Sequence, residues 1–178
     1  RNDLSILTPQ GIEQSIQAGN ALKGLRIDEL YSSPLKRAAD TTKNLIKQIS
    51  TQLTPNFDND LLEVELGEWS GMTTAEVQEQ FPESFKTWKN NPEGLLIKRS
   101  DGSDFHPIKD LKKQTKNFLK KLLDKYRNQN NIKTVLIVAH NAILRSIILE
   151  LIGEPPKGYI RLKLDNASIS VLNIKGKS

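Results

Sequence analysis

An uninterrupted apolar run that ends in a histidine constrains the fold of this chain more than any other segment. Residues 134–139 read Thr-Val-Leu-Ile-Val-Ala, and His140 follows directly. Apolar, largely β-branched runs of this kind are typical of strands buried on both faces in a parallel sheet. Apolar residues at helical spacing continue to Gly153, which indicates a helix just after His140. Ligands, anions above all, bind where such a strand meets a helix N-terminus, so His140 either contacts a ligand or simply ends the strand.

The rest of the chain alternates strand and helix patterns. Helices are predicted to begin at Thr8-Pro9, Ser33-Pro34, Thr73 and Pro107, and a further short helix after the break at Pro82 is expected to carry Phe85 and Trp88. Strands are predicted to cover residues 27–32, 134–139, 160–164 and 169–171, with irregular segments over 51–72 and 90–106. This order predicts one α/β domain over residues 1–178, with three αβα layers and a mostly parallel central sheet flanked by helices. The first predicted helix has no strand before it, so we expect the first strand of the domain to be missing from this sequence.

Composition narrows the possible functions. The chain has no cysteine and two histidines, which excludes thiolate metal sites and leaves little for a zinc or iron centre. We therefore expect a metal-independent protein without a cofactor. No apolar stretch approaches the roughly 20 residues that span a membrane, so we expect a cytoplasmic protein. The net charge of +5 comes largely from the lysine-rich segment 109–127, which we interpret as a solvated helix face because it lacks the interleaved aromatic residues of a nucleic-acid binder.

Arg37 lies in the first turn of a helix that follows a predicted strand. By connectivity this strand end faces the same side of the sheet as His140. A cation at a helix N-terminus opposes the helix dipole, and its guanidinium group has the planar fork that suits phosphate oxygens. An anionic ligand between Arg37 and His140 would resolve this conflict. The alternative is a surface arginine that is bonded to a nearby carboxylate.

Four segments carry a resemblance that covers essentially the whole chain. They are residues 32–41 (Ser-Ser-Pro-Leu-x-Arg-Ala-x-x-Thr), 61–71 (Leu-x-Glu-x-x-x-Gly-x-Trp-x-Gly), 135–140 (Val-Leu-Ile-Val-Ala-His) and 166–172 (Asn-x-Ser-x-Ser-Val-Leu). In this order they resemble the motifs of the histidine phosphatase superfamily, whose founding activity is phosphoglycerate mutase. The segment Arg1-Asn-Asp-Leu-Ser, the segment Phe105-His-Pro and Asn141 are similar to phosphatases related to 2-carboxy-D-arabinitol 1-phosphate phosphatase.

The resemblance implies a phosphoglycerate mutase-like fold and phosphoryl transfer through a phosphohistidine, without a metal. Arg37 matches the second phosphate-binding arginine of the family, and His140 matches the second histidine, which hydrogen-bonds the phosphoryl group. Glu63 matches the acid that protonates the leaving oxygen, a role that requires a raised pKa or a proton shared with the phosphate. The substrate would be a small phosphorylated metabolite, such as a sugar or sugar-acid phosphate.

Further residues are candidates for contacts with the substrate or for the role of proton donor. The backbone amides of Asn141 and Ala142 are candidates for binding the substrate. Arg1 either contacts substrate at the mouth of the pocket or is merely the end of the sequence. Glu65 and Glu68 are alternatives to Glu63 as the proton donor, but Gly67 and Trp69 fit the family motif when Glu63 holds that place.

One part of the family pattern is not in the sequence. The nucleophilic histidine of the family lies in an Arg-His-Gly motif at the end of the first strand, and Arg1 matches the segment just downstream of it. We therefore expect the nucleophile upstream of residue 1 and little activity from residues 1–178 alone. His106 is not expected to replace it, because nothing near it in the sequence would fix its orientation.

Three functions remain open. The first is a phosphatase of a small metabolite, and the second is a phosphoglycerate mutase, which the basic residues Lys86, Lys89, Lys98 and Arg99 do not decide. The third is a catalytically inactive domain that binds or senses a phosphorylated ligand. It is disfavoured because the loss of a central strand would expose apolar area and unpaired backbone. No nucleic-acid or membrane partner is expected, and homo-oligomer formation is left open.

Overall fold

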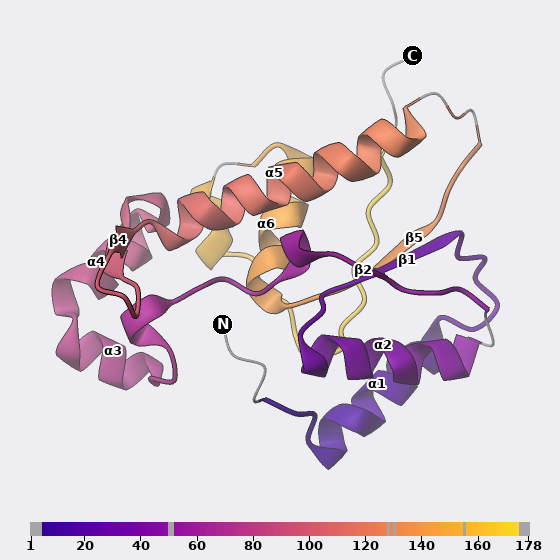
Figure 1. The fold of residues 1–178 in the computed structure, drawn as a ribbon, viewed down its shortest axis with the longest axis horizontal. Helices are drawn as coiled ribbons and strands as arrows, with labels where there is room; N and C mark the ends of the chain where they lie inside the picture. The colour runs from indigo at the N-terminus through magenta and orange to yellow at the C-terminus, as the bar shows by residue number, and fades with distance from the viewer. Residues whose placement is uncertain (1–4, 50–51, 128, 130, 155, 175–178) are drawn as a thin grey trace.

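A small parallel sheet forms the centre of the fold. The computed structural model describes residues 5–49, 52–127, 129, 131–154 and 156–174 (Figure 1). Three strands lie in the order β2 (Asn56–Phe57), β1 (Glu29–Ser32) and β5 (Val135–Val138), and both pairings are parallel. The register of β1 and β5 sets Ser32 opposite Val138, so the two strands end at the same edge of the sheet.

Two helical layers cover the sheet. Helices α1 (Pro9–Ala21) and α2 (Lys36–Ile49) lie below the strands in Figure 1, and α5 (Pro107–Tyr126) and α6 (Asn141–Ile152) lie above them. Alternate strand residues point to opposite layers. Leu30, Leu136 and Val138 pack in the α1–α2 layer, whereas Tyr31, Val135 and Ile137 pack against the α5–α6 layer. The predicted three-layer αβα arrangement with a parallel sheet is therefore confirmed.

Capping residues mark several helix ends as predicted, although α2 begins at Lys36, two residues after the expected Pro34. Thr8 caps α1 by accepting a hydrogen bond from the Gly11 amide. Thr73 and Glu76 form the predicted capping box at the start of α3 (Thr74–Gln80). Gly153 ends α6 in the left-handed conformation that glycine adopts most readily. These local signals act within one helical turn, so they can be read without knowledge of the fold.

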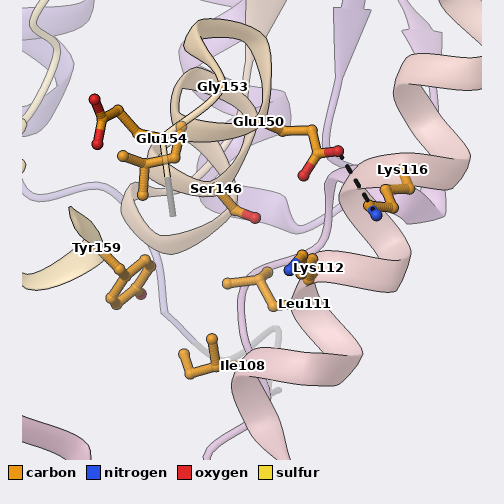
Figure 2. Close-up of a pocket in the computed structure, with 10 residues that line it drawn as sticks. Ile108, Leu111, Lys112, Lys116, Ser146, Glu150, Gly153, Glu154 and Tyr159 are labelled. Atoms are coloured by element: carbon orange, nitrogen blue, oxygen red, sulfur yellow. Dashed lines mark ion pairs between the residues drawn. The ribbon is translucent and has the colours of Figure 1, made fainter. Parts of the chain in front are cut away.

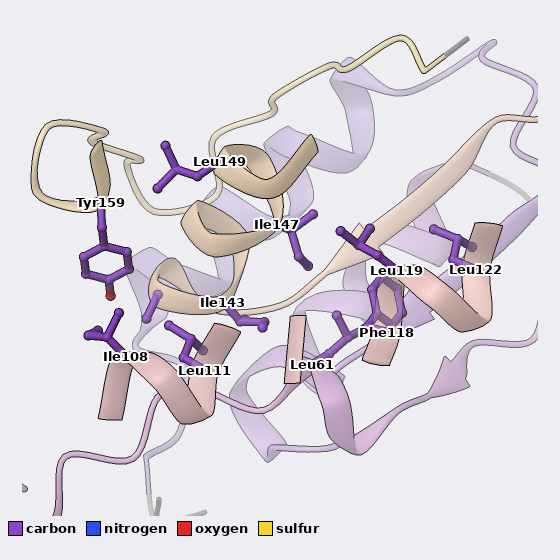
Figure 3. Packing of buried hydrophobic residues seen from close by; sticks show 11 residues of the cluster. Leu61, Ile108, Leu111, Phe118, Leu119, Leu122, Ile143, Ile147, Leu149 and Tyr159 are labelled. Carbon is purple, nitrogen blue, oxygen red and sulfur yellow. The ribbon is translucent and has the colours of Figure 1, made fainter. Parts of the chain in front are cut away.

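The main core lies between α5, α6 and the sheet (Figure 3). Phe118 and Leu111 of α5 meet Ile143 of α6, and all three side chains are almost completely buried. Leu61 belongs to the same cluster and comes from the short 3₁₀ turn η1 (Asn59–Leu61). The buried Leu61 therefore anchors the segment that carries Glu63 to the body of the protein.

Residues 66–105 form a side lobe at one end of α5. The lobe contains the turn η2 (Gly67–Trp69), α3, α4 (Pro82–Asn90), the turn η3 (Pro92–Gly94) and a hairpin of β3 (Ile97–Lys98) and β4 (Asp104–Phe105). It has its own apolar cluster, centred on Trp69 and Phe105. The hairpin lies where the sequence predicted an irregular loop, because two-residue strands leave too little alternation to detect.

The two strands predicted at the end of the chain are wrong. Residues 162–165 and 168–174 adopt no regular secondary structure, and the turn η4 (Pro156–Ile160) precedes them. Ile169 and Val171 are largely exposed to solvent. A strand requires a neighbouring strand as well as an alternating pattern, and these residues pair with no strand in the described part of the chain.

Five of the seven lysines of α5 form ion pairs with acidic residues. Lys112 pairs with Glu93, Lys116 with Glu150, Lys120 with Asp124, Lys121 with Asp58 and Asp60, and Lys125 with Glu29. This pattern favours a solvated face that is balanced by acidic neighbours. Among the helices that the structure describes, none is both long enough and apolar enough to cross a lipid bilayer.

Gly67 lies where the segment that carries Glu63 enters the side lobe, and it packs closely against Lys98 of the lobe. It adopts a positive φ of 45°, and a Cβ atom there would overlap the backbone carbonyl of Lys98. We expect Gly67→Ala to lower the free energy of unfolding by at least about 3 kcal/mol, measured by urea denaturation. Gly71→Ala is the matched control, because Gly71 has a φ of 84° but open space around it; it should cost about 1–2 kcal/mol. Equal losses would show that the contact with Lys98 is unimportant.

Candidate active site

Because β1 and β5 are parallel and end level with each other, the segments that follow the two strands start side by side. Ser33 follows β1 and donates its backbone N–H to the Val138 carbonyl at 2.9 Å. His140 lies two residues beyond β5 and precedes the first residue of α6. The strand register therefore sets the start of α2 beside the start of α6, and the positive ends of both helices lie at the same edge of the sheet.

His140 is buried at this edge, with 7% of its surface exposed. Its Nε2 atom lies 2.7 Å from the hydroxyl oxygen of Ser33. Burial, and secondly the positive charge of Arg37, lower the pKa of His140 from its ordinary value of 6.5 to about 4. The imidazole ring is therefore neutral at physiological pH.

Glu63 reaches the same place from the irregular segment between β2 and the side lobe. One of its carboxylate oxygens accepts hydrogen bonds from the amides of Val64 at 2.9 Å and Ala142 at 3.1 Å. Burial raises the pKa of Glu63, although these amides and the charge of Arg37 oppose the shift. Gln114 of α5 holds the segment in place by donating to the carbonyls of Asp60 and Leu62. Glu63 thus retains a proton at a higher pH than an ordinary glutamate.

Arg37 is the second residue of α2 and is half-buried. Its positive charge helps to lower the pKa of His140 and opposes the rise in the pKa of Glu63. The structure thus brings together the three residues that the sequence analysis placed in one site, from three separate parts of the chain. Their roles in catalysis stay predictions.

The remaining candidates have different surroundings. The Ala142 amide, predicted to face the substrate, donates to Glu63 instead. The Asn141 side chain donates to the Leu164 carbonyl at 2.8 Å and so ties α6 to the C-terminal segment. Arg1 lies outside the described residues. Any contact of Ala142 with a substrate would require its amide to be shared with Glu63 or released by it.

Glu65, Glu68 and His106 form contacts with residues of the side lobe. Glu65 pairs with Arg99 at 3.6 Å, and Glu68 accepts a hydrogen bond from the Lys98 amide at 3.0 Å. The Nδ1 atom of His106 contacts the Leu95 carbonyl at 2.7 Å. These contacts favour Glu63 over Glu65 and Glu68 as the acid that works with His140.

Two residues near the site were not singled out from the sequence. Ser33 contacts His140 directly; its position immediately after a strand, within a motif, was the available signal. Tyr159 is buried, and burial followed by the charge of Glu63 raises the pKa of its phenol, while Arg145 opposes this shift. The Arg145 guanidinium lies 5.4 Å from the centre of the Tyr159 ring. No pattern marked Tyr159, because it lies in an irregular turn.

A pocket of about 350 Å³ lies between α5, the end of α6 and Tyr159 (Figure 2). Its floor is apolar, with Ile108 and Leu111, and the Lys116–Glu150 ion pair lies at its rim. Arg37, Glu63 and His140 do not line this pocket. It is therefore distinct from the candidate site. In the described part of the chain, no group of three or more histidine, aspartate or glutamate residues is arranged to hold a metal ion.

The depressed pKa of His140 predicts a pH-dependent contribution to stability. The unfolded state binds this proton more tightly, so the contribution is complete above pH 6.5 and is lost as the pH falls towards 4. The expected loss is about 3 kcal/mol. Glu63 acts in the opposite direction, because its raised pKa lets the folded state take up a proton first as the pH falls.

Urea denaturation at neutral pH and near pH 4 measures this effect. His140→Gln should reduce the loss of stability between the two conditions relative to the unmodified chain, whereas the matched variant His106→Gln should not. An NMR titration that gives His140 an ordinary pKa would contradict the burial argument.

Known proteins similar to this chain include several phosphatases. The chain is 29% identical over 172 residues to the probable 2-carboxy-D-arabinitol-1-phosphatase of Arabidopsis thaliana. This alignment covers 97% of this chain and 33% of that protein. It is 27% identical over 169 residues to phosphoserine phosphatase 1 of Hydrogenobacter thermophilus, covering 95% of this chain and 75% of that protein. The chain thus spans about a third of the length of the Arabidopsis relative.

The fold is shared with solved structures as well. The structure of Bacillus stearothermophilus YhfR matches with a TM-score of 0.80 at 21% identity, over 96% of this chain and 79% of that chain. The family model described as histidine phosphatase superfamily (branch 1) matches residues 1–178. This chain belongs to the histidine phosphatase superfamily.

Proposed function

We propose that the protein containing this chain hydrolyses the phosphate ester of a small metabolite through a phosphohistidine intermediate. The observation that carries the proposal is the meeting of Arg37, Glu63 and His140 at the carboxyl ends of β1 and β5. Two relatives of this chain, a probable 2-carboxy-D-arabinitol-1-phosphatase and a phosphoserine phosphatase, are named for small phosphorylated carboxylic acids. The proposed substrate class is accordingly small phosphorylated metabolites, such as a sugar phosphate or a sugar-acid phosphate.

Each of the three residues has a chemical role in this proposal. Arg37 binds phosphoryl oxygens with its guanidinium fork and balances their charge, together with the N-termini of α2 and α6. His140 donates a hydrogen bond to the phosphoryl group. Glu63 gives its proton to the leaving oxygen, and the burial that raises its pKa keeps that proton available. No cofactor is needed for these steps.

The nucleophile is proposed to lie upstream of residue 1. β5 is an edge strand among the described residues, and β1 occupies its other side. A preceding strand that added at this edge of β5 would end next to His140, at the same side of the sheet. A histidine at the end of that strand would attack the phosphorus atom in line and form the phosphohistidine that water then hydrolyses.

Phosphoglycerate mutase is the second candidate, and the side lobe gives it less support. Such an activity needs basic residues that grip the carboxylate of the substrate. Lys98 pairs with Asp104, and Arg99 pairs with Asp110 at 2.7 Å and with Glu65. Both cations are therefore already balanced by carboxylates within the lobe and at the start of α5.

Activity with p-nitrophenyl phosphate tests where the nucleophile lies. We expect residues 1–178 to show little or no turnover, and a protein extended by the preceding coding sequence to be active. The control is the extended protein with its upstream histidine changed to alanine, which should be as inactive as residues 1–178. Robust turnover by residues 1–178 would refute the upstream nucleophile. An inactive extended protein that still bound phosphate would favour a binding or regulatory domain.

Leaving-group dependence tests the role of Glu63. In the extended, active protein, Glu63→Gln should lower kcat for an alkyl phosphate about a hundredfold or more. The effect on p-nitrophenyl phosphate should be much smaller, because nitrophenolate leaves without a proton. Glu65→Gln is the matched control on the same segment and should change neither rate strongly. Equal losses on both substrates for Glu63→Gln would exclude it as the proton donor.

A further inference from the structure

We propose that Ser33 is a positioning residue that holds His140 as the tautomer protonated on Nδ1, so that the ring presents its Nδ1–H group to the phosphoryl group. The identity of the phosphoryl ligand rests on the proposed function. The assignment of the tautomer does not, because it follows from the hydrogen bonds of Ser33 and His140.

The Ser33 backbone is fixed from several sides. Its N–H donates to the Val138 carbonyl of β5, and its carbonyl accepts a hydrogen bond from the Ser32 hydroxyl at 3.0 Å. The Ser32 oxygen in turn lies 2.9 Å from the Thr42 hydroxyl of α2. All three of these side chains are completely buried. The Ser33 hydroxyl is therefore held at a defined place between β1, β5 and α2.

The direction of the hydrogen bond to His140 follows from the partners of this hydroxyl. The Ser33 oxygen already accepts a hydrogen bond from the Leu35 amide at 3.3 Å. Its proton needs an acceptor, since a buried hydroxyl without one is unfavourable. Among the described residues, the acceptor within reach is Nε2 of His140, at 2.7 Å. Ser33 therefore donates to Nε2, and the proton of the neutral ring lies on Nδ1.

This arrangement leaves Nδ1–H for a ligand. In the described part of the chain, no hydrogen-bond partner of Nδ1 is present, and Nε2 is occupied by Ser33. Arg37 of α2 is the charged group that acts on the ring, and it opposes uptake of a second proton. The histidine thus serves as a neutral donor of fixed orientation, and the positive charge at the phosphoryl group comes from Arg37.

Nitrogen-15 NMR of the imidazole rings tests the tautomer directly. The chain has two histidines, so His106→Gln assigns the signals. His106 also supplies an internal standard, because its Nδ1 contacts a carbonyl that can only accept, and its neutral ring must carry the proton on Nδ1. At mildly alkaline pH we expect both rings of residues 1–178 to give the Nδ1–H pattern. An Nε2–H pattern for His140 would overturn the proposal.

Variants of Ser33 separate positioning from general stability. Ser33→Ala should convert the single tautomer of His140 into a mixture, and Ser33→Thr, which keeps the hydroxyl, should restore the single form. Ser15→Ala is the matched control: Ser15 is equally buried and bonded to Ile12 and Asn44 of the α1–α2 layer, away from His140. It should leave the tautomer unchanged. An unchanged tautomer of His140 in Ser33→Ala would overturn the proposal. If that variant does not fold, the tautomer of His140 in the unmodified chain and in Ser33→Thr still tests the proposal.

Binding of inorganic phosphate to the extended protein distinguishes failure of this inference from failure of the proposed function. We expect Ser33→Ala to weaken phosphate binding about tenfold and Ser15→Ala to leave it unchanged. If the Nδ1–H tautomer is found but phosphate does not bind, the proposed function fails while the assignment of the tautomer stands. If phosphate binds equally well to Ser33→Ala and to the unmodified protein, the positioning role of Ser33 fails.

Discussion

The parallel pairing of β1 with β5 is the interaction on which the rest of the structure depends. Its register ends the two strands level with each other, at Ser32 and Val138. Because α2 and α6 both start just beyond these ends, Arg37 and His140 meet although about 100 residues separate them. A shift of the register by one residue would also turn the apolar side chains of β5 to the opposite layers, so the packing of both helical layers protects the geometry of the site.

Helix α5 is the second determinant of the site, although none of its residues is a candidate for catalysis. Leu111 and Phe118 pack in the core with Leu61, and Gln114 holds the carbonyls that precede Glu63. At the N-terminal end of the same helix, Asp110 pairs with Arg99 of the side lobe. The helix thus sets the position of the acid and of the lobe together.

The pKa values of Glu63 and His140 are shifted in opposite directions. Both Glu63 and His140 are buried, and burial disfavours the charged form of each. The outcome is opposite in sign for an acid and a base: the carboxyl group holds its proton more tightly and the imidazole more weakly. Arg37 then supplies the positive charge that neither of the other two provides. Such an arrangement suits an anionic ligand whose leaving group needs a proton.

Much of this protein could be predicted from the sequence because the relevant signals are local. Capping at Thr8 and Thr73, the apolar run before His140 and the glycine that ends α6 each act within a few residues. These signals give most of the helices, the strand before His140 and the α/β class, but the expected burial of that strand on both faces is wrong for the described residues, because β5 lies at the edge of the sheet and only Val138 is buried. The motif resemblance pointed to Arg37, Glu63 and His140. The same local reasoning was wrong for residues 160–171, because alternation describes a strand but does not supply the neighbour that a strand requires.

Only the tertiary structure decided how these residues act on one another. The contact of Ser33 with His140, the use of the Ala142 amide by Glu63 and the burial that shifts both pKa values join segments far apart in the chain. Hydrogen-bond partners and burial are properties of the packed layers, and no spacing along the sequence encodes them. The sequence by itself determined which residues could form the site, whereas the pairing of β1 with β5 and the packing of α5 determined where these residues lie and how deeply they are buried.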